Sequence, residues 1–254
     1  MSPSTDTRES REFASEIKFL ITTALAGQIH DWARARLAPD PNAAADLGDA
    51  YRVTTFYFDT EQFDVFHRRG SFGRSKYRIR RYGENGVAFL ERKLKTRGLL
   101  TKRRSVVELH ELQRLAGAEA ERDWAGYWFL QRLLARRLKP ACQISYRRTA
   151  RVAMAGCGPI RLTLDNDIHA LPATGLTFKN GEKGARLLEN QVILELKYRF
   201  ETPVLFKLLV EEFALNPQPI SKYRLAAAAL GLVADASPNF SAMTKPETFL
   251  CLTF

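Results

Sequence analysis

The segment Ile160-Arg-Leu-Thr-Leu-Asp-Asn-Asp167 alternates polar and apolar residues along its length. Side chains alternate between the two faces of a strand, so its polar set shares one face: Arg161, Thr163, Asp165 and Asp167. Gln191–Arg199 repeats the pattern, with Glu195, Lys197 and Arg199 on one face. A sheet built from such strands must either expose both charge signs to water or line a wet, polar cavity with them. The second arrangement predicts a site for a polyanion.

Eight segments carry this kind of pattern and predict antiparallel strands: Glu16–Ile21, Arg52–Asp59, Lys76–Tyr82, Val87–Leu94, Lys102–Leu109, Gln143–Arg151, Ile160–Ile168 and Gln191–Arg199. Turns are expected at Gly83–Gly86 and at Thr96–Gly98. Apolar residues at helical spacing predict four helices, the first capped by Thr22 or Thr23 and ending near Leu37. The others are Arg122–Leu138, a helix from Pro203 to about Leu215, and Lys222–Leu232 capped by Ser221. The fold class is therefore α+β and mainly β.

The chain has 254 residues, which allows one large domain or two small ones. It shows no internal repeat, no low-complexity block and no interior linker rich in Gly, Ser or Pro. We therefore expect one domain over residues 12–234. A disordered N-terminal tail, residues 1–11, is expected before it, and a C-terminal tail, residues 235–254, after it.

The net charge of +11 predicts an anionic partner such as phosphate chains, nucleic acid or an acidic membrane surface. The three cysteines and four histidines have no spacing typical of a disulfide framework or a metal site. The first eleven residues lack the apolar core of a signal peptide, and the longest apolar stretch, Leu225–Ala234, is too short to cross a bilayer. We expect a soluble, cytoplasmic protein.

Basic residues recur on one face of several predicted strands. Lys76, Arg78 and Arg80 share a face, where they repel one another unless water or an anion neutralises them. Guanidinium groups suit paired phosphate oxygens, and lysine suits them as a point charge. The alternative is that these are solvated faces of a two-layer sandwich. Mid-strand Arg and Lys on so many strands, with enough helices to cover the outside of a closed sheet, favour the cavity.

Carboxylates lie among these cations: Glu16, Glu91, Glu108, Asp165, Asp167 and Glu195. Acidic side chains in a basic anion site suit Mg²⁺ or Mn²⁺, hard cations that bridge phosphate and protein oxygens. The spacing of Asp165 and Asp167 fits such a metal site and equally fits simple salt bridges.

Eight motifs occur in the order seen in VTC domains, the polyphosphate polymerase domain of the vacuolar transporter chaperone complex. They are Glu16-Ile-Lys18, Tyr57-Phe-Asp-Thr60, Tyr77-Arg-Ile-Arg-Arg-Tyr-Gly83, Phe89-Leu-Glu-Arg-Lys93, Tyr146-Arg-Arg-Thr149, Arg161-Leu-Thr-Leu-Asp165, Val192-Ile-Leu-Glu-Leu-Lys197 and Ser221-Lys-Tyr223. The resemblance runs from about Arg11 to Leu232. Each motif alone is weakly specific, and the eight in order are strongly so. VTC domains belong to the triphosphate tunnel metalloenzymes.

The resemblance implies an eight-stranded antiparallel β-barrel tunnel with a charged lumen, flanked by about four helices. It implies that Lys18, Arg78, Arg80 and Lys222 are catalytic and that Glu195 holds Mn²⁺ or Mg²⁺. It further implies substrate contacts from Lys93, Lys102, Tyr146, Arg148, Arg161, Lys197 and Ser221. The chain departs from the ExExK pattern of many tunnel enzymes, because Ala14 stands at the first Glu position. This resembles the VTC branch more than the cyclase or thiamine-triphosphatase branches.

The leading functional hypothesis is an ATP-dependent polyphosphate polymerase. The alternatives are hydrolysis of triphosphate or polyphosphate in the same tunnel, and non-enzymatic binding of polyphosphate or nucleic acid. Specific nucleic-acid binding is not expected, because Phe56, Phe58 and Tyr77 fall opposite many of the charges, as core residues do. The expected partners are ATP, triphosphate and polyphosphate.

Overall fold

The strands follow from the alternation, and the turns between them from residues that accept unusual backbone angles. β5 (Ser75–Tyr82) and β6 (Val87–Thr96) form a hairpin. At the start of its turn Gly83 has φ +54°, a left-handed conformation that glycine adopts without steric cost. The computed structural model describes residues 7–10, 15–41, 49–96, 99–117 and 120–234. The hairpin predicted at Gly83–Gly86 is confirmed, whereas the turn at Thr96–Gly98 falls largely outside the described residues.

All the strands belong to one antiparallel sheet, in the order β1-β7-β6-β5-β4-β8-β9-β11-β2, with β10 beside β9 and β3 beside β8. The eight predicted strands are all present as β2 (Ser15–Thr22), β4 (Ala50–Asp59), β5, β6, β7 (Leu99–Glu108), β8 (Lys139–Ala155), β9 (Gly158–Pro172) and β11 (Gln191–Tyr198). Three short strands are added: β1 (Thr7–Ser10), β3 (Ala38–Pro39) and β10 (Ala185–Arg186). Part of the expected N-terminal tail is thus a strand, β1, paired with β7.

The sheet is curled, although its ladder of paired strands is open. In the described residues the path of hydrogen-bonded strands ends at β1 on one side and β2 on the other. Nevertheless Glu16 Oε2 of β2 lies 2.8 Å from Lys93 Nζ of β6, near the opposite end of the path. The two sides of the sheet therefore face each other across one concave surface, which we call the inner face.

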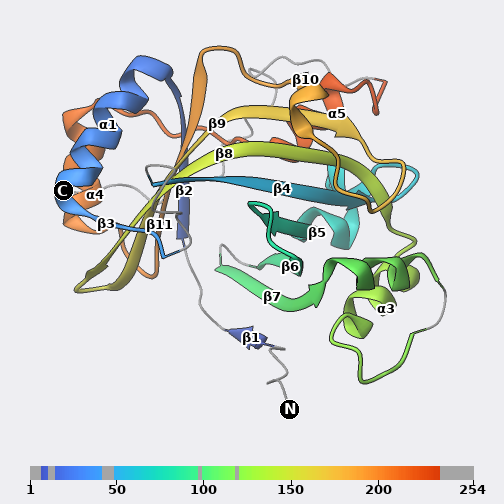
Figure 1. Ribbon diagram of the computed structural model, residues 1–254. Helices are drawn as coiled ribbons and strands as arrows, with labels where there is room; N and C mark the ends of the chain where they lie inside the picture. The colour runs from blue at the N-terminus through green and yellow to red at the C-terminus, as the bar shows by residue number, and fades with distance from the viewer. Residues whose placement is uncertain (1–6, 11–14, 42–48, 97–98, 118–119, 235–254) are drawn as a thin grey trace.

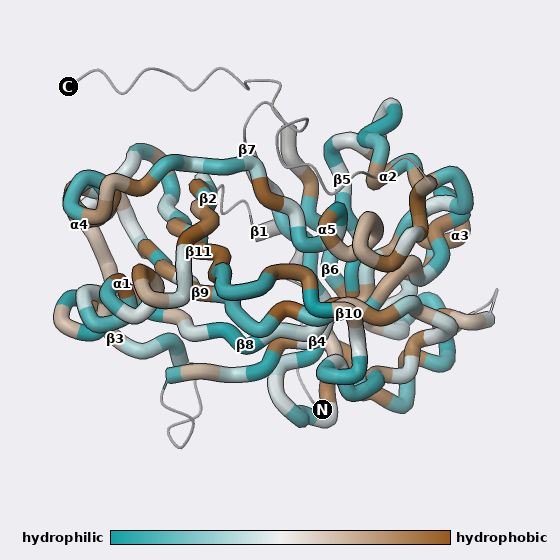
Figure 2. Tube along the Cα trace, turned by 90° about the horizontal axis from the view of Figure 1, so that it is seen from above, coloured by the Kyte–Doolittle hydropathy of each residue, from teal (hydrophilic) through white to brown (hydrophobic). Residues whose placement is uncertain are grey.

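The helices lie in two groups at opposite ends of the sheet, as Figures 1 and 2 both show. α1 (Thr23–Arg36) and α4 (Val204–Glu212) lie at one end, and α2 (Asp64–His67), α3 (Tyr127–Ala135) and α5 (Lys222–Ala229) at the other. Short 3-10 turns complete the structure: η2 (Gly70–Arg74), η3 (Leu109–Ala116) and η4 (Gly181–Lys183). The predicted caps are confirmed, because Thr22 Oγ1 accepts from Leu25 N at 3.2 Å and Ser221 Oγ from Arg224 N at 3.4 Å.

Two apolar cores pack against the outside of the curled sheet. α1 and α4 cover β2, β9 and β11, where Ile29 and Phe206 are fully buried. Burial of each such side chain contributes roughly 1.5–3 kcal/mol. Trp32 Nε1 of α1 donates to Glu212 Oε2 of α4 at 2.9 Å and joins the two helices. The second core lies beneath α3 and α5, around Phe58, Ile79 and Phe129. Because apolar side chains fill the outside, the charged faces of the same strands are left to the inside.

Two local predictions are wrong. The helix expected from Arg122 begins only at Tyr127, because the Trp124 ring folds back onto Gly126, where a Cβ would lie 2.4 Å from it. Asp167 does not continue the face of Asp165. The register of β8 and β9 shifts between Ser145 and Arg147, and Asp167 adopts φ +50° in this bulge. Its carboxylate contacts His169 at 2.8 Å instead of facing inward.

Candidate functional site: a charged inner face

The inner face gathers ionisable side chains from strands far apart in sequence. Its carboxylates are Glu16, Glu91, Asp165 and Glu195, and ion pairs join each of them to at least two cations. The cations outnumber them: Lys18, Lys76, Arg78, Arg80, Lys93, Lys102, Arg104, Arg148, Lys197 and Lys222. This excess of positive charge suits an anion with several charges.

Glu195 is the centre of the largest group. The β11–β2 register places it opposite Lys18, and the two side chains approach to 3.4 Å. Lys197 and Lys222 lie at 3.2 Å and Arg148 at 3.8 Å from its carboxylate oxygens. Burial alone would raise the pKa of Glu195, but these four cations outweigh it and hold the pKa well below its usual range. Glu195 is therefore an anion near neutral pH.

Asp165 and Arg148 form a bidentate ion pair beside the group centred on Glu195. Arg148 Nε and Nη2 lie 2.6 and 2.7 Å from the two Asp165 oxygens, and Lys222 Nζ lies 2.5 Å from Oδ2. Burial raises the pKa of Asp165, and the charges of Arg148 and Lys222 lower it further than burial raises it. The ring of Tyr146 lies beneath both cations, with Lys222 Nζ 5.0 Å from its centre. Lys222 thus bridges the carboxylates of Asp165 and Glu195.

Glu91 gathers a second set of cations on β5, β6 and β7. It is fully buried, with Arg78 and Arg104 at 2.6 Å and Lys102 at 3.2 Å. Burial would raise the pKa of Glu91, but Arg78 and its neighbouring cations hold it well below its usual range. Glu16 forms a third centre, with Lys93 at 2.8 Å, Lys18 at 2.9 Å and Lys197 at 4.0 Å.

The N-terminus of α5 lies at the inner face and brings Ser221 and Lys222 into it. Lys18 Nζ donates to Ile220 O at 3.2 Å, and Lys76 Nζ donates to Ser221 Oγ at 3.1 Å. On the side away from the cavity, the Tyr223 hydroxyl donates to the buried Asp59 carboxylate at 2.5 Å. Asp59 also accepts from the backbone N–H groups of Val65 and Phe66. α5 is therefore fixed from both sides, which fixes the position of Lys222.

Two inner-face cations have no carboxylate within ion-pair distance among the described residues, Lys76 and Arg80. Arg80 is 5% exposed and donates to Thr55 Oγ1 at 3.2 Å. Burial lowers the pKa of Lys76 to about 7, and the charges of Lys18, Lys93 and Arg68 add to the effect. In the same way burial lowers the pKa of Lys93 to about 8. A bound anion would supply the counter-charge that Lys76 and Arg80 lack.

The depressed pKa of Lys76 predicts a pH dependence. The unfolded chain holds this proton up to about pH 10.5, whereas the folded empty protein releases it above about pH 7. The Lys76 contribution therefore makes the free energy of unfolding rise with pH across that window. An anion beside Lys76 restores the proton, so tripolyphosphate should bind more tightly as the pH falls from about 9 to 7. The gain from Lys76 should reach up to about tenfold per pH unit.

Isothermal titration of tripolyphosphate in buffers of different ionisation enthalpy measures both the affinity and the proton uptake. Lys76→Met is the matched variant, and protonation of the ligand itself cancels in the comparison. Equal proton uptake by wild type and Lys76→Met between pH 7 and 9 would contradict the prediction.

The structure brings most of the predicted site residues together. Lys18, Arg78, Lys93, Lys102, Arg148, Glu195, Lys197 and Lys222 all belong to the three ion-paired groups, with Arg80, Tyr146 and Ser221 adjoining them. Arg161 differs, because it pairs with Asp40 at 2.8 Å and donates to the Tyr51 hydroxyl at 2.8 Å. Glu108 is exposed and caps η3. Ala14 lies outside the described residues.

Several participants were assigned to charged strand faces from the sequence but were not included in the predicted site. They are Glu16, Lys76, Glu91 and Asp165. The strand alternation already placed them, so the signal was present. The alternation did not show that these residues belong to the site, because it does not tell which carboxylate contacts which cation across the curled sheet. Tyr82 was missed altogether: its hydroxyl accepts from Arg104 Nη2 at 3.0 Å.

The donor set suits a divalent ion only in part. The described residues contain no group of three or more His, Cys, Asp or Glu side chains arranged to hold a metal. The oxygens of Glu195, Glu16 and Asp165 are nonetheless the hard donors that Mg²⁺ and Mn²⁺ prefer. Mg²⁺ in phosphate-handling proteins is usually held by one or two carboxylates together with substrate oxygens. The donor chemistry of the inner face is therefore compatible with an ion that a bound phosphate chain helps to hold.

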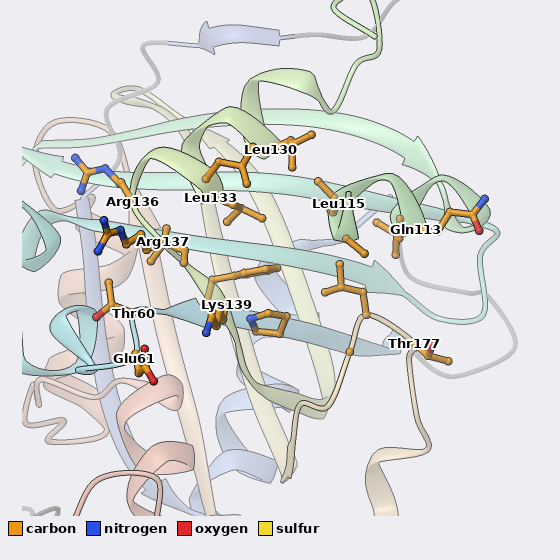
Figure 3. Close-up of a pocket in the computed structure, with 18 of the residues that line it drawn as sticks. Thr60, Glu61, Gln113, Leu115, Leu130, Leu133, Arg136, Arg137, Lys139 and Thr177 are labelled. Atoms are coloured by element: carbon orange, nitrogen blue, oxygen red, sulfur yellow. The ribbon is translucent and has the colours of Figure 1, made fainter. Parts of the chain in front are cut away.

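A groove of about 1260 Å³ lies on the outside of the fold, and none of the predicted site residues line it. Figure 3 shows its wall of leucines, including Leu115, Leu130 and Leu133, with Arg136 and Arg137 at one end and Gln113 at the other. Its lining combines this apolar wall with four basic and two acidic side chains, and it shares none of the three ion-paired groups of the inner face. No helix in the described ranges is long and apolar enough to cross a membrane.

The chain is similar to known proteins in sequence and in fold. The model of the VTC domain family matches residues 13–231. Among solved structures, a putative adenylate cyclase from Bacillus halodurans has a TM-score of 0.50 at 15% identity, covering 83% of this chain and 94% of that one. A putative adenylyl cyclase from Hippeastrum, described as having a dominant triphosphatase activity, gives 0.49 at 14% identity, covering 85% and 95%. A conserved hypothetical protein from Pyrococcus furiosus gives 0.45 at 13%, covering 84% and 99%. No curated protein matches the sequence.

Proposed function

Because the chain belongs to the VTC domain family, within the triphosphate tunnel metalloenzymes, we propose that its inner face lines a tunnel for polyphosphate synthesis. The proposed reaction is transfer of the γ-phosphoryl group of ATP to a growing phosphate chain. An oxygen of the terminal phosphate of the chain attacks the γ-phosphorus. The bond from the γ-phosphorus to the β,γ-bridging oxygen breaks, and ADP leaves with that oxygen.

The observation that carries this proposal is the state of the inner-face carboxylates. The pKa of Glu16, Glu91, Asp165 and Glu195 is lowered in each case, because nearby cations outweigh the effect of burial. Carboxylates with such low pKa values are poor general bases near neutral pH. A terminal phosphate is already anionic and needs no base, whereas a water molecule does. The arrangement therefore favours phosphate over water as the nucleophile.

We assign the remaining roles from the contacts. Phosphoryl transfer depends on positioning and on neutralising charge. Lys18, Arg78, Arg80 and Lys222 face the transferred group in this proposal. Arg148, Lys93, Lys102 and Lys197 hold the flanking phosphates together with Tyr146 and Ser221, and Arg161 binds phosphate nearer Asp40 and Tyr51. Glu195 would hold the metal, and a metal there would neutralise charge that develops in the transition state.

Incubation of the protein with ATP and Mn²⁺ should yield ADP and phosphate chains longer than tripolyphosphate. The test is a gel of the products beside an assay for released orthophosphate. The reaction without Mn²⁺ is the control. Orthophosphate formed in step with ADP, with no chains on the gel, would contradict polymerisation and favour hydrolysis.

Hydrolysis in the same cavity is the second candidate, and Tyr82 favours it. Burial would raise the pKa of this phenol, but the neighbouring Arg80 and Arg104 outweigh burial and lower it to about 7. A phenol with that pKa can accept a proton from water near neutral pH. Tyr82→Phe should therefore abolish orthophosphate release if the enzyme is a hydrolase, and should leave chain synthesis largely intact if it is a polymerase.

A further inference from the structure

A second basic cavity lies on the outer face of the hairpin that carries Lys76 and Lys93. It has a volume of about 260 Å³ and is lined by three arginines and two serines: Arg74, Arg92, Arg136, Ser71 and Ser75. A tyrosine and a leucine are also part of its lining, and the described residues of the lining include no carboxylate. The predicted site residues of the inner face do not line it.

The outer cavity and the inner face lie on opposite faces of the same two strands, β5 and β6. Ser75 and Tyr77 flank Lys76 on β5, and Arg92 and Leu94 flank Lys93 on β6. Because side chains alternate, the same two strands carry lysines on one face and the outer cavity on the other. Ser75 is the first residue of β5, and Arg74 immediately precedes it. Arg74, at the outer cavity, is therefore only two residues from Lys76 on the inner face.

Other arginines lie near Lys76 and in the outer cavity. Arg68 is close enough to Lys76 to lower its pKa, and close enough to Arg224 to lower that pKa as well, in both cases after the larger effect of burial. In the outer cavity, Arg136 Nη1 donates to Ser71 Oγ at 3.2 Å, and its guanidinium lies 5.0 Å from the centre of the Phe72 ring. These contacts hold Arg136, at the end of α3, towards the cavity.

The side chains that line the outer cavity indicate which class of ligand it fits. Guanidinium and hydroxyl groups suit phosphate oxygens. Nucleic acid would need aromatic platforms for its bases. The one aromatic of the lining, Tyr77, is 2% exposed and packs against Phe129. A volume of about 260 Å³ is also small beside the roughly 300–1,000 Å³ typical of small-molecule sites. The cavity fits a short stretch of phosphate chain.

We propose that the outer cavity formed by Arg74, Arg92 and Arg136 binds a distal stretch of a polyphosphate chain whose near end occupies the inner face. The inference rests on the proposed function, since it assumes that the inner face holds phosphate. Binding at two linked places raises the affinity for chains that are long enough to reach both. Short chains gain nothing from the outer cavity.

Binding measurements without turnover test this. Affinities for tripolyphosphate and for a polyphosphate of several tens of units are compared in wild type and in Arg74→Gln/Arg136→Gln. Both arginines are at least partly exposed, so their replacement should spare the fold. We expect about tenfold weaker binding of the long chain and unchanged binding of tripolyphosphate. Arg136→Lys, which keeps the charge, should restore part of the loss. Arg34→Gln, an exposed arginine on α1 at the far end of the sheet, is the control.

The outcomes separate the two proposals. If tripolyphosphate binds wild type but the double variant binds long chains normally, the outer cavity is not a polyphosphate site. The proposed function of the inner face is then unaffected. If neither ligand binds wild type, the proposed function fails as well. If single-stranded DNA of equal charge binds more tightly than polyphosphate and loses affinity in the double variant, the cavity serves nucleic acid and this proposal is overturned.

Discussion

Lys222→Ala should reduce chain synthesis from ATP by about 10²-fold or more, the usual cost of removing one charge donor aimed at a reacting group. Lys222 Nζ lies 2.5 Å from Asp165 and 3.2 Å from Glu195, at the N-terminus of a helix that points into the inner face. Both carboxylates keep other cations, Arg148 for Asp165 and Lys18, Lys197 and Arg148 for Glu195. We therefore expect the variant to remain folded and to melt only a few degrees lower.

The measurement is the rate of ADP formation together with the product gel. Lys207→Ala removes an exposed lysine on α4 and is the matched control, expected to behave as wild type. Lys222→Arg keeps the charge and should recover part of the activity. Full activity in Lys222→Ala would show that Lys222 pairs with the carboxylates for structure alone.

Glu195→Gln should have the largest effect on the empty protein. Four cations lie within 3.8 Å of its carboxylate and would lose their shared counter-charge at once. Removing one partner from a buried ion pair typically costs about 3–5 kcal/mol. For a domain of this size that corresponds to a fall in melting temperature on the order of 10 °C. Metal-dependent turnover should also be lost, if Glu195 holds the ion.

Tripolyphosphate should rescue this variant more than it stabilises wild type, because the ligand replaces the missing negative charge. Melting curves with and without tripolyphosphate measure the difference. Glu189→Gln removes an exposed negative charge just before β11, and it controls for the change in net charge. A Glu195→Gln protein that melts like wild type without ligand would mean that its four cations do not depend on this carboxylate.

The arrangement of strands could be predicted from the sequence because alternation is a local property. Ile160–Ile168 and Gln191–Arg199 each show which of their residues share a face, so the eight main strands followed directly. Alternation alone left open whether the charged face of Glu195 meets water or a cavity, and the mid-strand cations and the resemblance to VTC domains favoured the cavity. The boundaries of helices and strands were less predictable, because side-chain packing can override the local pattern of polar and apolar residues. Trp124 and Gly126 delay α3, and the bulge at Asp167 removes a carboxylate that the alternation had placed beside Asp165.

The pairing of charges could not be predicted from the sequence. Nothing local indicates that Glu16 meets Lys93 across 77 residues, or that Lys222 reaches Asp165 and Glu195. These contacts depend on how the sheet curls and on where α5 is fixed by Tyr223 and Asp59. The same holds for the lowered pKa of Lys76, which depends on burial and on neighbouring cations.

The pairing of β2 with β11 also has a consequence for synthesis on the ribosome. β2 ends at residue 22, yet its partner strand begins only at residue 191, and the helix that carries Lys222 comes later still. Contacts between segments so far apart in the chain are slow to form, because the entropy cost of closing a long loop comes before the contacts can lower the free energy. Hairpins such as β5–β6 can form while the nascent chain is still growing. The ion-paired groups around Glu16 and Glu195 cannot, because they need β2, β11 and α5. They should be the last part of the protein to assemble and the first to open when the ends of the sheet separate.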